Sequence, residues 1–171
     1  MLGMRLAPAF VPSPEAVGPA MLKLAGLRPG ETLVDLGCGD GRLLQLAVAE
    51  FGAERAIGYE LEDDLASSAY AACADDRITV HHKDALEAEA CVQQADVVSL
   101  YLTESGNASV LPMLRRALRP DARVVSYVWG MGDSLPPAQT ARAVGEGVVL
   151  TVGKPNILLW TGEQLGGPAE R

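Results

Sequence analysis

The chain has 171 residues, of which 49% are hydrophobic and 21% are charged, proportions that are ordinary for one globular domain. Its formal net charge of −8 disfavours broad binding to a nucleic acid backbone, which needs clustered lysine and arginine. No apolar run reaches the roughly 18 residues of a membrane span, so a soluble protein without a membrane partner is expected. The three cysteines have no metal-ligand spacing, so no metal is expected, and reduced thiols favour a cytoplasmic location.

The predicted elements begin after a proline-rich opening. Residues 1–14 contain three prolines and are expected to be irregular. Ser13 is a candidate N-cap for a first helix, which Gly26 can end. Further along the chain, strands are predicted at 32–36, 56–60, 78–82, 95–102 and 122–128, with β segments near 141–144 and 156–160, and helices at 42–51, 63–73 and 108–118.

Strands that alternate with helices imply parallel pairing through right-handed crossovers. We therefore expect an α/β fold with a Rossmann-like, doubly wound, mostly parallel seven-stranded sheet and helices on both faces. A single domain spanning residues 1–171 is expected, because no linker or internal repeat interrupts the pattern. Residues 162–171 are expected to form a loose tail.

The first strand ends in a glycine-rich loop, Asp35-Leu36-Gly37-Cys38-Gly39-Asp40-Gly41, which opens into a helix. Ligands of doubly wound sheets bind beyond the carboxyl ends of the strands, where glycine allows close approach of the backbone. The third glycine comes one position too early for a dinucleotide fingerprint, and Asp35 would repel a pyrophosphate. Asp35 instead suits a ligand that carries an ammonium and a sulfonium, so NAD is disfavoured. Cys38 is interpreted as a small filler of the loop.

This loop resembles motif I of the class I S-adenosylmethionine-dependent methyltransferases. The resemblance continues at Glu60–Leu61, where the family places an acid that holds the ribose hydroxyls, and at Asp84–Ala85, where an acid and nearby backbone contact the adenine. Asp84 is also a candidate N-cap for a following helix. The resemblance implies S-adenosylmethionine as the cofactor, bound by Asp35, Gly37, Cys38, Gly39, Glu60, Leu61, Asp84 and Ala85.

A narrower resemblance concerns the methyl acceptor. Phe10–Pro14, Tyr101–Thr103 and Met131–Asp133 are similar to segments of small archaeal and mitochondrial protein lysine methyltransferases. This implies N-methylation of a protein substrate with an accessible lysine. Tyr127 and Val128 depart from a His and an acid that are common in these relatives. A small-molecule or nucleic-acid methyltransferase, and a non-catalytic S-adenosylmethionine-binding module, therefore stay open as alternatives.

A lysine acceptor must lose its proton before it attacks, and its reference pKa is about 10.4. A desolvating channel lined by aromatic side chains lowers that cost without a dedicated base. Tyr101 is nominated as the catalytic channel residue. Phe10 and Trp129 are candidates either for the rim of the active site or for the core.

Overall fold

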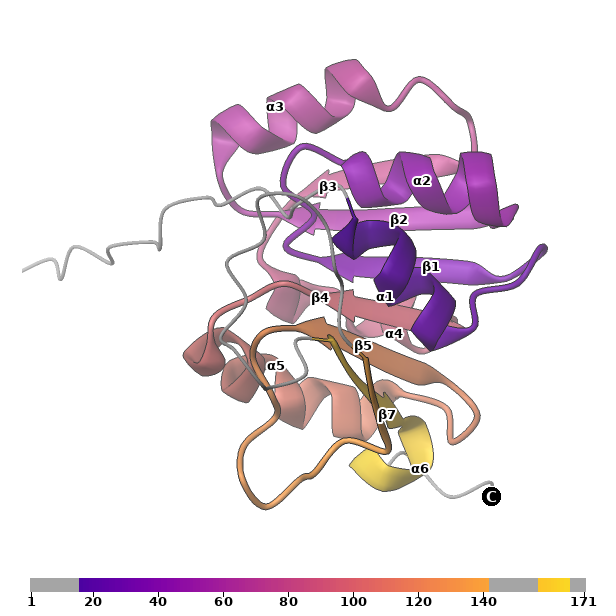
Figure 1. Ribbon diagram of the computed structural model, residues 1–171. Helices are drawn as coiled ribbons and strands as arrows, with labels where there is room; N and C mark the ends of the chain where they lie inside the picture. The colour runs from indigo at the N-terminus through magenta and orange to yellow at the C-terminus, as the bar shows by residue number, and fades with distance from the viewer. Residues whose placement is uncertain (1–15, 142–156, 167–171) are drawn as a thin grey trace, which may run out of the picture.

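The computed structural model describes residues 16–141 and 157–166, and within them seven strands form one sheet in the order β3-β2-β1-β4-β5-β7-β6 (Figure 1). The strands are β1 (Thr32–Leu36), β2 (Arg55–Glu60), β3 (Ile78–His82), β4 (Val97–Leu100), β5 (Arg123–Tyr127), β6 (Gln139–Ala141) and β7 (Ile157–Thr161). Pairs among β1 to β5 are parallel, whereas β7 runs antiparallel to both β5 and β6. The predicted fold class, a mostly parallel seven-stranded sheet, is confirmed.

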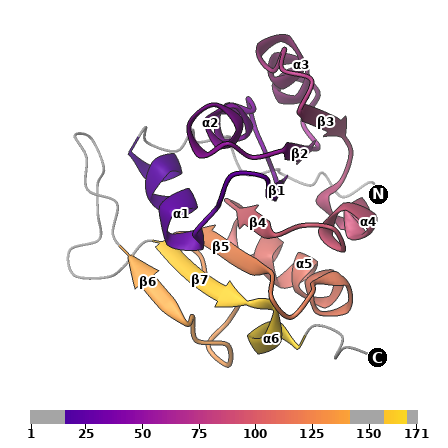
Figure 2. The same cartoon turned by 90° about the vertical axis from the view of Figure 1, so that its right-hand side faces the viewer.

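Helices cover both faces of this sheet (Figure 2). They are α1 (Val17–Ala25), α2 (Arg42–Phe51), α3 (Asp63–Ala72), the 3-10 helix η1 (Ala85–Glu87), α4 (Glu89–Val92), α5 (Glu104–Ala117) and α6 (Gly162–Leu165). Figure 2 shows α1, α2 and α3 on one face and α4, α5 and α6 on the other. Within the described ranges, no helix is both long enough and apolar enough to cross a bilayer.

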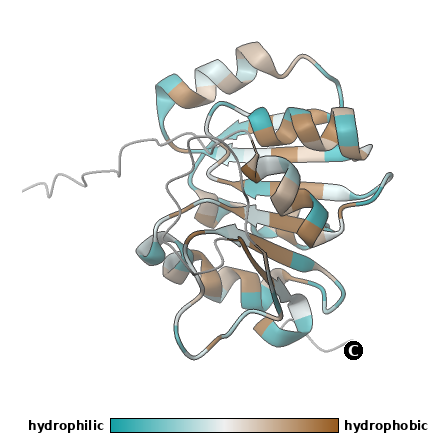
Figure 3. Ribbon diagram, viewed as in Figure 1, coloured by the Kyte–Doolittle hydropathy of each residue, from teal (hydrophilic) through white to brown (hydrophobic). Residues whose placement is uncertain are grey.

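Two apolar cores result, one on each side of the sheet. Successive residues of a strand point to opposite faces, so Leu33 packs in the core with α1 and α2, while Val34 and Leu36 pack in the core with α5. The middle strands are mostly hydrophobic, as their burial on both faces requires (Figure 3). Asp35, between Val34 and Leu36, therefore faces the side of α1 and α2. This polar residue is 4% exposed.

Capping residues account for two differences from the predicted boundaries. Helix α5 begins at Glu104, four residues before the predicted start at 108, because the Thr103 hydroxyl accepts a hydrogen bond from the Gly106 N–H at 3.2 Å. The loose tail predicted from Gly162 is wrong for Gly162–Leu165, which form α6. A capping box between Thr161 and Gln164 starts that helix, and Leu165 is buried in the core.

Other predictions concern the first helix, the residues before it and the segment near residues 141–144. The irregular segment 1–14 and the Ser13 N-cap lie outside the described residues, where α1 is described from Val17. Gly26 ends α1 in the left-handed conformation, as predicted. Of the β segment predicted near 141–144, Ala141 is the one described residue, and it ends β6.

Candidate active site

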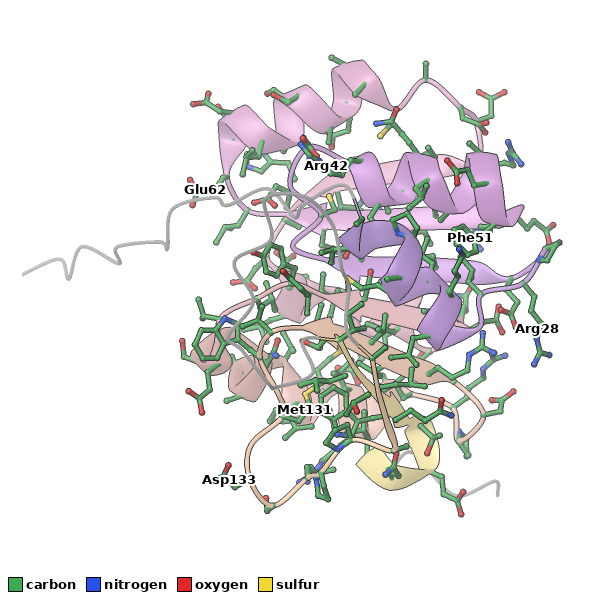
Figure 4. All side chains as sticks on the ribbon, in the orientation of Figure 1. Arg28, Arg42, Phe51, Glu62, Met131 and Asp133 are labelled. Atoms are coloured by element: carbon green, nitrogen blue, oxygen red, sulfur yellow. The ribbon has the colours of Figure 1, made fainter. Side chains whose placement is uncertain are left out.

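The glycine-rich loop lies at the carboxyl edge of the sheet, between β1 and α2. Gly37, Gly39 and Gly41 have φ values of 87°, 56° and 79°, which favour glycine. The N–H groups of Gly37 and Cys38 both donate to the Tyr59 carbonyl of the neighbouring strand, at 2.9 and 3.0 Å. The loop is therefore tied to the end of β2. In Figure 4, Arg42 and Glu62 lie toward this edge, and Phe51 and Arg28 lie toward the opposite one.

A cavity of about 290 Å³ lies against this loop, walled by α1, α2 and the end of β4. Five predicted site residues line it, namely Asp35, Gly37, Cys38, Gly39 and Tyr101. The other four, Glu60, Leu61, Asp84 and Ala85, are not among the lining residues; Glu60 is the last residue of β2, and the others lie just beyond β2 and β3. The structure thus places the predicted residues at one edge of the sheet, but divides them between a cavity and a neighbouring surface.

The α1 wall of the cavity was missed by sequence reasoning. Gly18, Pro19 and Met21 line the cavity beside Leu43 and Leu46 of α2. A Cβ at Gly18 would lie 3.1 Å from Leu46 Cδ2, so this glycine lets α1 approach α2 closely. No motif marks these residues, and the sequence predicted no more than a helix here.

Asp35 is the acidic residue of the cavity wall. Its carboxylate oxygen Oδ1 accepts a hydrogen bond of 2.6 Å from the Ser99 hydroxyl, which lies opposite it in the β1–β4 register. Burial raises the pKa of Asp35 to about 7; the bond from Ser99 opposes this shift, and the charge of Glu60 adds to it. A cationic ligand would stabilise the ionised form of this buried carboxyl, since a nearby positive charge lowers the pKa of an acid.

Cys38 is buried in the same loop. Burial, together with the charges of Asp35 and Glu60, raises the pKa of the Cys38 thiol well above its usual range. The thiol is therefore protonated at neutral pH and is a poor nucleophile. Its position between two glycines agrees with the interpretation of Cys38 as a filler of the loop.

Glu60 holds the loop from the end of β2. Its Oε2 accepts a hydrogen bond from the Gly39 N–H at 2.8 Å, and its Oε1 accepts from the N–H groups of Leu61 and Glu62, both at 2.9 Å. A carboxylate offers roughly four acceptor positions, so one remains on Oε2. That position can accept a hydroxyl hydrogen bond from a ligand without release of the loop.

Beyond β3, Asp84 acts as a cap in the described structure. Its Oδ1 accepts from the Leu86 N–H at 2.9 Å and so begins η1, which is the alternative role that the sequence left open. Leu61 and Leu86 are 58% and 49% exposed. Leu61 directly follows Glu60, and Leu86 follows Asp84 by two residues, so each predicted acid has an exposed apolar side chain next to it in the chain.

Aromatic side chains mark the ends of β4 and β5. The Tyr101 ring, at the cavity wall, packs 5.0 Å from the Tyr127 ring, measured between centroids. Burial raises the pKa of both phenols, so both are protonated at neutral pH. Trp129 follows on the surface, and Phe10 lies outside the described residues.

Comparison with known proteins shows the family of the chain. The family model described as the ANTKMT methyltransferase domain matches residues 35–138, which is more than half of the chain. The chain belongs to the ANTKMT methyltransferase family. A protein-lysine N-methyltransferase from Saccharolobus islandicus is 32% identical over 122 residues, which cover 69% of this chain and 74% of that protein.

Two further relatives of this ANTKMT-family methyltransferase have other names. The crystal structure of an RNA methyltransferase from Salinibacter ruber, in complex with S-adenosylhomocysteine, is similar with a TM-score of 0.74 and 34% identity. The match covers 88% of this chain and 93% of that one. A ribosomal protein L11 methyltransferase from Thiobacillus denitrificans is 31% identical over 101 residues but is covered over 33% of its length. The predicted class, an S-adenosylmethionine-dependent methyltransferase, is confirmed.

The state of Asp35 predicts how this methyltransferase binds its cofactor as pH changes. Below pH 7 the unliganded carboxyl is mostly protonated. A cofactor whose ammonium binds at Asp35 would hold the carboxyl ionised, so its binding would release a proton. Affinity for S-adenosylmethionine is therefore expected to be full at pH 8 and about tenfold lower at pH 6. Calorimetry in two buffers of different ionisation enthalpy measures the released proton directly. The matched variant Asp35→Asn should bind more weakly and show a flatter profile, and a wild-type affinity that is constant from pH 6 to 8 would contradict the assignment.

Proposed function

We propose that this methyltransferase transfers the methyl group of S-adenosylmethionine to the side-chain nitrogen of a protein lysine. The observation that carries the proposal is the cavity wall itself. It brings the buried acid Asp35 and the aromatic ring of Tyr101 to one small space, which Met21, Leu43 and Leu46 make largely apolar. With the ammonium end of the cofactor at Asp35, such a space would admit a long unbranched side chain past Tyr101 and leave little water around its amine.

The described residues fit the cofactor in three places. Asp35 would hold the ammonium end, because its buried carboxyl is stabilised by a positive charge. Glu60 would accept one ribose hydroxyl at its remaining Oε2 position. Leu61, Asp84 and Ala85 would contact the adenine at the exposed edge beyond β2 and β3. The backbone of Gly37, Cys38 and Gly39 would contact the cofactor between Asp35 and Glu60.

Each residue near the acceptor has a role that follows from its environment. When bound, the cofactor supplies an activated methyl group on a sulfonium. The lysine Nζ gives up its proton to solvent, forms a bond to the methyl carbon as the sulfur–carbon bond breaks, and S-adenosylhomocysteine is left. Because burial keeps the Tyr101 phenol protonated, Tyr101 would align and desolvate the amine rather than act as its base.

RNA is the second candidate acceptor, because a relative with 34% identity is an RNA methyltransferase. Charge favours the protein acceptor. The chain has 22 acidic against 14 basic residues, and phosphate contacts require clustered lysine and arginine. Two cations near the site are already paired, since Arg42 lies 2.6 Å from Asp40 and Lys83 lies 3.9 Å from Glu87.

The test is a partition experiment with the full chain. The protein is incubated with tritium-labelled S-adenosylmethionine and a cell lysate, and label is counted separately in protein, RNA and small-metabolite fractions. We expect label in protein, at bands that are absent with Asp35→Asn. Label confined to RNA or metabolites would reject the lysine acceptor. Cofactor binding by calorimetry without label in any fraction would indicate a binding module instead.

A further inference from the structure

The loop that follows β5 has an unusual backbone. Val128 has a φ of 69°, and among the described residues it is the one non-glycine residue with positive φ. For a β-branched side chain this conformation is a genuine outlier. Such conformations persist where the surrounding structure over-determines them, and they concentrate at ligand-binding sites.

A buried asparagine holds this conformation in place. Asn107, fully buried in α5, donates from Nδ2 to the carbonyls of Trp129 at 2.9 Å and Gly130 at 3.2 Å. The Ser126 hydroxyl also donates to the Trp129 carbonyl, at 2.7 Å. These hydrogen bonds hold the backbone of Trp129, while its side chain is 43% exposed. The Trp129 ring is therefore a surface group on a fixed backbone rather than part of the core.

Trp129 borders a groove of about 330 Å³. Trp160, Pro136 and Pro137 supply apolar walls, while Glu104 at the start of α5 and Asp133 on the loop supply two exposed carboxylates. Figure 4 shows Asp133 and Met131 on this loop. Among the described residues, neither carboxylate forms an ion pair.

The groove and the cavity in which methyl transfer is proposed both have lining residues just beyond the carboxyl ends of β4 and β5. Tyr127 packs on Tyr101, which lines that cavity, and Trp129 follows Tyr127 by two residues. Two residues span at most about 7 Å. Helices α1 and α2, which wall the cavity, and the start of α5, which walls the groove, lie on opposite faces of the sheet. A peptide whose lysine enters the cavity would therefore cross the carboxyl edge of the sheet to place a flanking residue beside Trp129.

We propose that the groove formed by Trp129, Glu104 and Asp133 binds the segment of the acceptor protein that flanks the target lysine, and selects a positively charged segment. This inference rests on the proposed lysine acceptor. Charge complementarity identifies the occupant, since unpaired carboxylates beside an exposed indole attract arginine or lysine through both ionic and cation–π contacts. An acidic segment would meet like charges there.

Intrinsic fluorescence tests the proposal without any methyl transfer. The chain has two tryptophans; Trp160 is fully buried, with its indole N–H donating to the Leu135 carbonyl at 2.9 Å, so Trp129 is the solvent-sensitive one. Two short peptides serve as probes, each with a central lysine, flanked by arginines in one and by glutamates in the other. We expect the arginine peptide to produce a saturable blue shift that the glutamate peptide does not produce.

Matched charge variants separate the groove from general electrostatics. Glu104→Gln with Asp133→Asn should raise the Kd of the arginine peptide at least tenfold. Glu54→Gln with Asp76→Asn removes the same charge from exposed positions that precede β2 and β3, at the opposite edge, and should change the Kd less than twofold. No saturable shift, or equal effects of the two pairs, would overturn the proposal. Peptide binding without any lysine methylation would reject the proposed function but support the groove as a binding site. Lysine methylation that the groove variants do not slow would support the proposed function but reject the groove.

Discussion

Replacing Glu60 with alanine is expected to weaken the binding of both S-adenosylmethionine and S-adenosylhomocysteine by about ten- to a hundredfold. The variant would lose the charge-assisted hydrogen bond that we propose between Glu60 and the ribose, worth roughly 1.5–3 kcal/mol, which corresponds to this range of affinity. It also leaves the Gly39, Leu61 and Glu62 N–H groups without the acceptor that holds the loop. Isothermal titration calorimetry measures both ligands.

The neighbouring Glu62 offers a matched control. Its side chain is exposed and does not cap α3, so Glu62→Gln removes a nearby charge without touching the loop and should bind like the wild type. Glu60→Gln keeps one accepting oxygen and should give an intermediate affinity. Wild-type affinity in Glu60→Ala would show that Glu60 does not contact the cofactor.

The second large effect is expected from Gly58→Ala, in the middle of β2. A Cβ at this position would lie 2.5 Å from Cys38 Sγ and 2.7 Å from Leu44 Cδ1. Both neighbours are buried, so the loop or the start of α2 must shift. Such overpacking costs typically about 1–3 kcal/mol. We expect a lower melting temperature and weaker cofactor binding, because the shift moves the Gly39 N–H away from Glu60.

A double variant isolates the cause. Cys38→Ala removes the nearest atom, the sulfur, so Cys38→Ala with Gly58→Ala should recover part of the stability lost in Gly58→Ala alone. Thermal unfolding followed by circular dichroism gives the comparison. If Gly58→Ala melted and bound ligand like the wild type, the close packing of the loop against β2 would play no part in the site.

The strands and helices were predictable where the hydrophobic pattern and the residues that end an element agree. The predictions for β1, α2 and β3 match their bounds, because apolar runs end at glycines or at a turn. Helix α5 began earlier than predicted and α6 was missed, since both depend on a threonine cap that the apolar periodicity does not signal. Periodicity identifies the buried face of a helix, whereas the cap decides where the helix begins.

The site was predictable as far as it rests on the loop motif and strand ends. Ser99 was missed because its bond to Asp35 joins residues 64 apart in sequence, and the β1–β4 register that pairs them is a property of the sheet. Asn107 was missed for a similar reason, since its partners Ser126 and Trp129 belong to another strand and loop. Both are polar residues in apolar surroundings, which is the signal that could have marked them.

The most direct measurement of the account is the position of the transferred methyl group. Acceptor proteins modified by the full chain with deuterated-methyl S-adenosylmethionine are digested and sequenced by tandem mass spectrometry. The account predicts deuterated methyl groups on lysine Nζ, and their loss when Asp35→Asn or Glu60→Ala replaces the wild type. Deuterated methyl groups on any other side chain, or on nucleobases with unmodified lysines, would contradict it.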